Sequence, residues 1–208
     1  MTLSHLHSVA PAAEPIDAAR AEGAARELLL ALGADLTDES LRETPRRMAE
    51  AYAELLTPRP FNATTFPNDE GYDELVVARD IRFHSLCEHH LLPFHGVAHV
   101  GYLPGERIVG LSKLGRVVDL YARRLQVQER LTTQVARWLG DTLEPRGVGV
   151  VIEAEHLCMS LRGVQKPGAR REDGHVGPAG HAALRPRQPG RVLRPGRRAA
   201  LRDGAPGG

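Results

Sequence analysis

The sequence is poor in the residues that cross-link small folds or hold chains in membranes. Among its 208 residues there are only two cysteines, Cys87 and Cys158. Two cysteines cannot make a disulfide scaffold, and their setting among histidines favours a reducing compartment, so we expect a cytoplasmic protein. No apolar stretch is long enough to cross a bilayer, and none precedes the first basic residue, Arg20. We therefore expect neither a membrane partner nor a secretory signal.

Charge of one sign is also missing, because the formal net charge is only +1. Bulk electrostatics therefore predict no nucleic-acid partner. Lysine is nearly absent: Lys113 and Lys166 are the two lysines among 27 basic residues, which suggests a GC-rich gene. The arginines are unevenly placed, since residues 171–208 hold eight of them against three acidic residues. The rest of the chain is correspondingly acidic.

Hydrophobic residues make up 42% of the chain, enough for one domain with a core. Residues 1–15 have no periodic pattern and are expected to form a flexible arm. Residues 16–32 are rich in Ala, Leu, Glu and Arg and predict a helix that ends at Gly33. Thr44-Pro45, a capping hydroxyl followed by proline, predicts the start of a second helix.

Strand patterns begin after a proline-rich segment, 58–72, which is expected to be a loop. The first strand is expected from near Glu74 to Cys87, the second from Phe94 to Leu103 and the third from Val148 to His156. One face of the first strand should carry Leu75, Val77, Ile81 and Phe83. Two amphipathic helices lie between the second and third strands, the first of them capped by Ser112. This order predicts an antiparallel α+β fold.

The stretch Cys87-Glu88-His89-His90 falls where the first two strands meet, and Cys158 follows the third strand. Cys87, His90 and Cys158 could give two thiolates and an imidazole to one ion. Tetrahedral zinc takes such ligands and keeps a fourth position for water. The alternatives are a Cys87–Cys158 disulfide, or a buried thiol among hydrogen-bonded core histidines.

Two further segments carry groups that suit a nucleotide. Gly110–Arg116 places a serine, a lysine and an arginine around a predicted helix start, where they could bind phosphate oxygens. Gln126–Arg130 opens the next helix with an amide and a carboxylate that could bind a purine edge. Each segment is also typical of a solvated helix end. Arg162 offers a cation close to Cys158 in the sequence.

Taken together, these segments resemble the GTP cyclohydrolase I family over about residues 16–170. The matching motifs occur in one order: Glu43-Thr44-Pro45-Arg46-Arg47, Cys87-Glu88-His89-His90, Gly110-Leu111-Ser112-Lys113, Gln126-Val127-Gln128-Glu129-Arg130, and His156-Leu157-Cys158-Met159 with Arg162-Gly163. The resemblance implies the tunnelling fold (T-fold) in a ring of subunits, in that family a homodecamer, with sites between subunits. It implies conversion of GTP and water to 7,8-dihydroneopterin triphosphate and formate, the first step of folate and pterin synthesis.

The resemblance also implies roles for individual residues. The cofactor would be zinc (Zn2+), held by Cys87, His90 and Cys158 and activating water for attack on C8 of guanine. His156 is similar to the histidine that shuttles a proton at the imidazole ring of the base, and His89 and Ser112 to the groups that assist ribose opening. The substrate-binding residues would be Gln128 and Glu129 at the guanine edge, and Lys113, Arg116, Arg162 and Arg47 at the triphosphate.

After Arg170 the resemblance ends, because the family continues with a Thr-rich strand and a closing helix. Residues 171–208 are instead dominated by Arg, Gly, Pro and Ala and contain no Ser, Thr, Lys or aromatic residue. We expect a disordered tail, either natural or read out of frame, since a shift of one base permits a Thr-rich strand. The edge of the third strand would then be unpaired, and the chain would assemble poorly or be unstable.

Three other functions remain open at this point. The chain could be another T-fold enzyme that acts on a pterin or deazapurine. It could be a non-catalytic T-fold subunit that keeps zinc for structure alone. It could also be the inactive product of a damaged reading frame.

Overall fold

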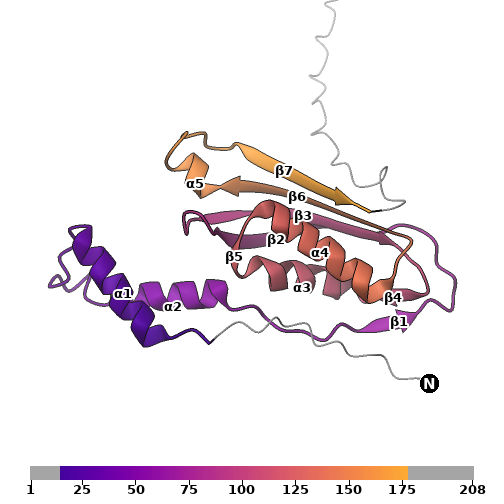
Figure 1. Cartoon of the computed structure of the whole chain (residues 1–208), viewed down its shortest axis with the longest axis horizontal. Helices are drawn as coiled ribbons and strands as arrows, with labels where there is room; N and C mark the ends of the chain where they lie inside the picture. Colours follow the sequence, from indigo (N-terminus) through magenta and orange to yellow (C-terminus); the bar gives the residue numbers. More distant parts are fainter. Residues whose placement is uncertain (1–14, 178–208) are drawn as a thin grey trace, which may run out of the picture.

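A five-stranded sheet with the order β5-β2-β3-β6-β7 forms the centre of this computed structural model, which describes residues 15–177 (Figure 1). Its long strands, β2, β3, β6 and β7, pair antiparallel, and the short β5 runs parallel to β2. The strand bounds are β2 Val76–Cys87, β3 Pro93–Leu103, β5 Leu125–Gln126, β6 Gly147–His156 and β7 Arg170–Val176. The predicted α+β class is confirmed.

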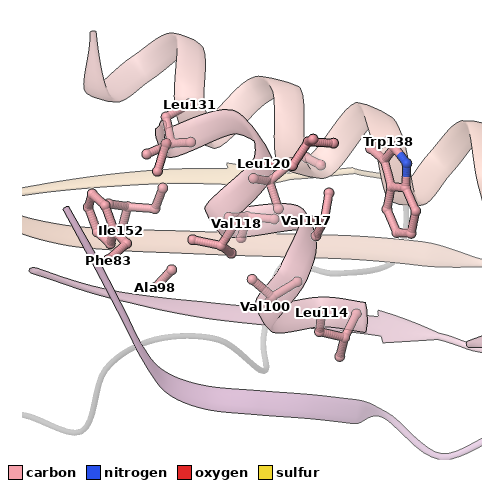
Figure 2. Close-up of a cluster of buried hydrophobic side chains, with 14 of the residues drawn as sticks. Phe83, Ala98, Val100, Leu114, Val117, Val118, Leu120, Leu131, Trp138 and Ile152 are labelled. Carbon is pink, nitrogen blue, oxygen red and sulfur yellow. The ribbon is translucent and has the colours of Figure 1, made fainter. Parts of the chain in front are cut away.

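Helices α3 (Leu111–Ala122) and α4 (Gln128–Leu143) cover one face of this sheet (Figure 1). Their apolar stripes meet strand residues in the core that Figure 2 shows, where Leu120 and Val118 lie among side chains of β2, β3 and β6. Burying one such side chain stabilises a fold by about 1.5–3 kcal/mol. This packing fixes the ends of the strands, where the candidate site lies.

The remaining elements lie at the ends of the sheet. Helices α1 (Ala18–Ala31) and α2 (Thr44–Leu56) pack against each other beside the main body (Figure 1). The short strands β1 (Thr65–Pro67) and β4 (Arg107–Val109) pair antiparallel, so the segment 58–72 is not wholly a loop as predicted. Helix α5 (Leu157–Ser160) follows β6. Within residues 15–177, no helix has the length and apolar character needed to span a membrane.

A β-bulge corrects the predicted face of β2. The register with β3 shifts between Ala78 and Ile81, and Asp80 in the bulge has a φ of 56°. Such an extra residue moves the alternation of the strand by one position. Val76 and Ala78, rather than Leu75 and Val77, therefore share the core face with the residues after the bulge.

Neither predicted hydroxyl cap is observed. Helix α3 begins at Leu111 with Gly110 as its N-cap, and α2 begins at Thr44 itself with Glu43 as its N-cap. No side chain caps either helix, although Pro45 does lie in the first turn of α2. Ser112 is consequently exposed and its hydroxyl is free of any cap bond.

Strand β7 corrects the expectation that the edge of β6 is unpaired. Residues 170–176 pair antiparallel with β6 from Glu155 to Gly149. The strand is altered in composition, with charged residues where the resemblance implied threonines, but it is not missing. The closing helix and the tail beyond residue 177 lie outside the described residues, as does almost all of the predicted N-terminal arm.

Candidate metal centre and substrate site

A tight turn after β2 places His90 beside Cys87. The backbone N–H groups of His90 and Leu91 both donate to the carbonyl of Cys87, at 3.3 and 2.8 Å. Leu91 adopts a φ of 55°, which lets the chain reverse into β3 within a few residues. The Cys87 Sγ lies 3.7 Å from His90 Nδ1 and 3.9 Å from His89 Nδ1.

Cys158 reaches the same place from β6, because β3 pairs with both β2 and β6. The pairing of Phe94 with His156 brings the end of β6 level with the Cys87–Leu91 turn, and α5 then carries Cys158 toward it. The ligand atoms of Cys87, His90 and Cys158 all lie within 4.8 Å of one another. Both cysteines are free thiols, so the alternative of a disulfide is not observed.

These separations fit a tetrahedral zinc ion. Bond lengths of about 2.3 Å to sulfur and 2.1 Å to nitrogen place tetrahedral ligand atoms about 3.6–3.8 Å apart. The 3.7 Å between Cys87 Sγ and His90 Nδ1 meets this value. Burial, and next the neighbouring Cys87 sulfur, raise the pKa of the Cys158 thiol. Two thiolates this close repel each other, and a dication between them removes that cost.

His156 is partly buried and lies next to Cys87, His90 and Cys158, the three residues of the metal triad. Its ring stacks on Phe94 with centroids 4.7 Å apart and an interplanar angle of 1°. Its Nε2 lies 2.8 Å from the side-chain oxygen of Gln128. Burial, followed by the charge of Arg171, lowers the pKa of His156 below its usual value. The ring is thus held on one face and at one nitrogen.

Gln128 is wholly buried, and its amide is fully used inside the protein. Its nitrogen donates to the carbonyls of Ile152 and Arg171, each at 3.0 Å, while its oxygen faces His156. Because the amide nitrogen has two acceptors, the oxygen must accept from the Nε2–H of His156. In this structure Gln128 supports the histidine and presents no free amide to a purine.

Glu129, by contrast, extends outward from the first turn of α4 with about half of its side chain exposed. Its carboxylate accepts a hydrogen bond from the Nη2 of Arg171 on β7. A hydrogen bond from its own backbone N–H, and secondarily Arg171, lower the pKa of Glu129. An ionised, reachable carboxylate therefore stands beside the metal triad and His156.

Glu88 and Arg130 form a contact that the sequence did not single out. The guanidinium of Arg130 donates to both carboxylate oxygens of Glu88, at 2.6 and 3.0 Å. The backbone N–H of Glu88 also donates to the carbonyl of Gln126. The pair therefore joins the turn that carries Cys87 and His90 to the start of α4. The adjacency of Glu88 to a metal ligand was the available sequence signal, since such ligands need orienting partners.

The predicted phosphate-binding residues lie at the other end of α3. The C-terminal end of α3 is near the metal triad, because the hydroxyl of Ser85 donates to the carbonyl of Ala122 at 2.6 Å. The N-terminal end follows β4, where the N–H of Val109 donates to Tyr102 at the far end of β3. Twelve helical residues span about 18 Å. Ser112, Lys113 and Arg116 are therefore not brought together with Cys87 in one chain.

The last two predicted cations differ in their distance from the triad. Arg162 is exposed in the loop after α5, close enough to Cys158 to favour its thiolate. Arg47 lies on the exposed side of α2. This helix contacts the Cys87–Leu91 turn (the metal turn) through a 3.4 Å hydrogen bond from the Tyr52 hydroxyl to the Leu91 carbonyl.

The two cations at the start of α3 have other neighbours. Lys113 lies over the ring of Phe61, and Arg116 lines a cavity of about 280 Å3 with Arg59 and Asp119.

This fold and this site define a class of protein. Two thiols and an imidazole converge at the ends of antiparallel strands, beside an oriented histidine and a half-exposed carboxylate that is paired with Arg171. That combination is typical of metal-assisted hydrolases.

Comparison with known proteins specifies the family. Residues 21–173 match the family model of GTP cyclohydrolase I. The chain is 57% identical over 176 residues to GTP cyclohydrolase 1 of Mycolicibacterium vanbaalenii, covering 81% of this chain and 86% of that protein. It is 58% identical over 159 residues to GTP cyclohydrolase 1 of Streptomyces coelicolor, covering 74% and 79%. The chain belongs to the GTP cyclohydrolase I family, and the predicted T-fold and enzyme class are confirmed.

A likeness to a solved structure is more distant. The archaeosine synthase QueF-Like in the apo form aligns with a TM-score of 0.41 and 19% identity, over 49% of this chain and 91% of that one.

Proposed function

We propose that this chain converts GTP and water to 7,8-dihydroneopterin triphosphate and formate, with zinc held by Cys87, His90 and Cys158. The observation that carries the proposal is the convergence of those ligand atoms within 4.8 Å in a chain of this family. Zinc, when bound, would supply Lewis acidity and lower the pKa of a coordinated water. The donor set of two sulfurs and one nitrogen suits zinc better than magnesium or calcium.

His156 is the acid–base group of this proposal. Gln128 accepts its Nε2–H, so the neutral ring carries its free lone pair on Nδ1. That nitrogen can take a proton and return it to a nitrogen of the guanine ring as the ring opens. The stack on Phe94 keeps the imidazole plane fixed while this happens. His89, exposed beside Cys87, and Ser112 would assist the later opening and rearrangement of the ribose.

Glu129 recognises the base. Its carboxylate can accept from N1–H and the 2-amino group of guanine together, a two-donor edge that adenine lacks. Gln128 was expected to share this role, but its amide is occupied, so we assign it to orienting His156. The proposed base-binding residue of this chain is thus Glu129 alone, next to the groups that act on the imidazole ring.

Assembly would bring the triphosphate residues to this site. In one chain Ser112, Lys113 and Arg116 are separated from the metal triad by the length of α3. A neighbouring copy in a closed ring can place its α3 start against the Glu129 side of this chain. The proposed unit is therefore a homo-oligomer, in this family a homodecamer. Arg162 from one chain, with Arg47 as an additional cation, would complete the triphosphate site.

The test is turnover of GTP by the purified full-length protein. Formate and a product that becomes fluorescent neopterin after oxidation and dephosphorylation are expected, and a zinc chelator should abolish both. His156→Ala should lower kcat by about 10²–10⁴-fold, the usual contribution of a general acid–base group. His95→Ala, which removes an exposed imidazole of β3, is the matched control and should leave the rate unchanged. Absence of formate from the zinc-loaded wild-type protein would refute the proposal.

A further inference from the structure

Arg171 contacts each part of the base-binding end of the site. Its guanidinium donates to Glu129, and its carbonyl accepts from Gln128, whose side-chain oxygen in turn bonds His156. The register places Arg171 opposite Ala154 of β6, on the sheet face that α4 covers. Arg171 also belongs to the part of β7 where the resemblance implied threonines. A residue of β7 thus occupies the carboxylate to which guanine is proposed to bind.

The guanidinium of Arg171 is chemically similar to the guanine edge that would displace it from Glu129. In guanine, N1 and the exocyclic 2-amino nitrogen are bonded to the same carbon, C2. Together with N3 these atoms form a guanidine unit. An arginine side chain offers the same paired N–H donors from nitrogens that share a carbon. Glu129 therefore meets similar donors whether Arg171 or the base is present, and the two cannot use the same carboxylate lone pairs at once.

A second carboxylate gives Arg171 an alternative partner. The Nε of Arg171 lies 3.1 Å from Oδ2 of Asp173, the next residue on the same face of β7. Asp173 is only 20% exposed, whereas Glu129 is 53% exposed. When a nucleotide takes Glu129, the guanidinium keeps one ion pair with Asp173. The displacement of Arg171 from Glu129 is therefore a partial one.

We propose that Arg171 is an affinity-setting residue that competes with the guanine edge for Glu129, an inference that rests on the proposed function. Binding of GTP then requires the Arg171–Glu129 pair to open. The apparent affinity for GTP is therefore the intrinsic affinity multiplied by the fraction of molecules in which this pair is open. Pairs between groups this exposed change equilibria by up to about five-fold. The competition acts on binding, because the reacting carbon of the base lies away from this edge.

Arg171→Thr is the principal variant. It should lower KM for GTP by about two- to five-fold, with zinc content unchanged. Threonine suits a strand, so loss of β7 is not expected. Arg170→Thr is the matched control: it removes the same charge from the adjacent position, on the opposite face of the sheet, and should leave KM unchanged. Asp173→Asn should act in the opposite direction and raise KM, because Arg171 would then have Glu129 as its one remaining carboxylate.

A cycle with Glu129→Gln identifies the contact. Calorimetric Kd values for GTP should show that Arg171→Thr tightens binding in the Glu129 protein and has no such effect in the Glu129→Gln protein. The inference would be overturned if Arg170→Thr and Arg171→Thr changed KM for GTP equally, or if Arg171→Thr raised it. Turnover of GTP by these proteins would still support the proposed function. Failure of every zinc-loaded protein, wild type included, to bind or turn over GTP would overturn both.

Discussion

The side-chain oxygen of Gln128 lies 2.8 Å from Nε2 of His156, and the other end of the same amide bonds the carbonyls of Ile152 and Arg171. One buried amide on the first turn of α4 therefore bonds both β6 and β7, and it also holds the ring of the proposed acid–base residue. The tautomer of His156 follows from the two acceptors that the amide nitrogen already has.

Replacing Gln128 should therefore impair catalysis more than substrate binding. Gln128→Leu leaves the carbonyls of Ile152 and Arg171 without their donor and His156 without its acceptor, which costs about 1–3 kcal/mol of stability. We expect kcat to fall by roughly 10–100-fold, as for other residues that orient a reactive group, with KM nearly unchanged. The 15N shifts of His156 should show that the Nε2–H tautomer is no longer favoured. A rise in KM with an unaltered kcat would instead support the original assignment of Gln128 to the guanine edge.

Removal of the metal should affect both activity and stability. Chelation should abolish formate release, and added zinc should restore it where magnesium does not, because the ligands are sulfur and nitrogen. Zinc at 100 times its Kd should stabilise the folded chain by about 2.7 kcal/mol, which a thermal scan can detect. Cys158→Ser should lose the response to zinc in that scan. A melting temperature that is indifferent to zinc would contradict the assignment of this triad.

The Glu88–Arg130 pair is expected to support the metal turn. Both side chains are partly exposed, at 29% and 45%, so solvent screens the pair and its contribution to stability is small. Arg130→Ala should accordingly weaken zinc affinity by no more than about five-fold, measured by competition with a chromogenic chelator. Exchanging the charges in Glu88→Arg with Arg130→Glu should recover part of the loss. If the double variant bound zinc no better than either single variant, the pair would have no orienting role.

The altered strand β7 gives a test at the level of the gene. Our hypothesis is that the segment after Arg170 is read out of frame, and sequencing across codons 165–175 decides it. A reading in the alternative frame should encode a Thr-rich strand followed by a helix. The expectation of poor assembly loses one of its reasons, because β7 pairs with the edge of β6, and size-exclusion mass of the 208-residue product tests what remains of it. A stable large ring formed by this product would contradict that expectation.

The convergence of Cys87, His90 and Cys158 was predictable because these residues lie at strand ends that the apolar alternation already located. Cys87 ends one strand and Cys158 follows another, and antiparallel pairing had only to bring those ends level. The bulge at Asp80 was not predictable, since alternation of apolar residues continues across it in either register. Strand β7 was missed because its charged residues have low strand propensity, and its pairing with β6 overrides that propensity.

The surroundings of the candidate substrate residues were harder to predict, because sequence motifs do not show which side chains already have hydrogen-bond partners inside the protein. Gln128 and Glu129 are neighbours in one motif, yet the first turn of α4 directs one into the core and the other outward. Arg171 was missed for a related reason: its partners are Glu129 on α4 and Asp173 on its own strand, and only the sheet register places them together. Burial and register are long-range properties that depend on the whole fold.

The separation of Lys113 from the metal triad predicts that active sites are shared between copies. A Lys113→Ala chain keeps the triad and His156, and a His156→Ala chain keeps the start of α3, so each alone should be inactive for want of one half-site. When the two are co-expressed, each mixed oligomer can pair an intact triad with an intact α3 start from its neighbour. Random mixing should restore about a quarter of the wild-type sites in a closed ring.

The measurement is formate release per milligram from the mixed oligomers, purified through a different tag on each chain. Mixing the two variants after separate assembly is the control, and it should give no recovery if subunits do not exchange. Recovery in the co-expressed sample alone would show that Lys113 and His156 act in one site from two chains. If the co-expressed sample stayed at the background of the single variants, the site would have to be completed within one chain, and the assignment of Lys113 to the triphosphate would be wrong.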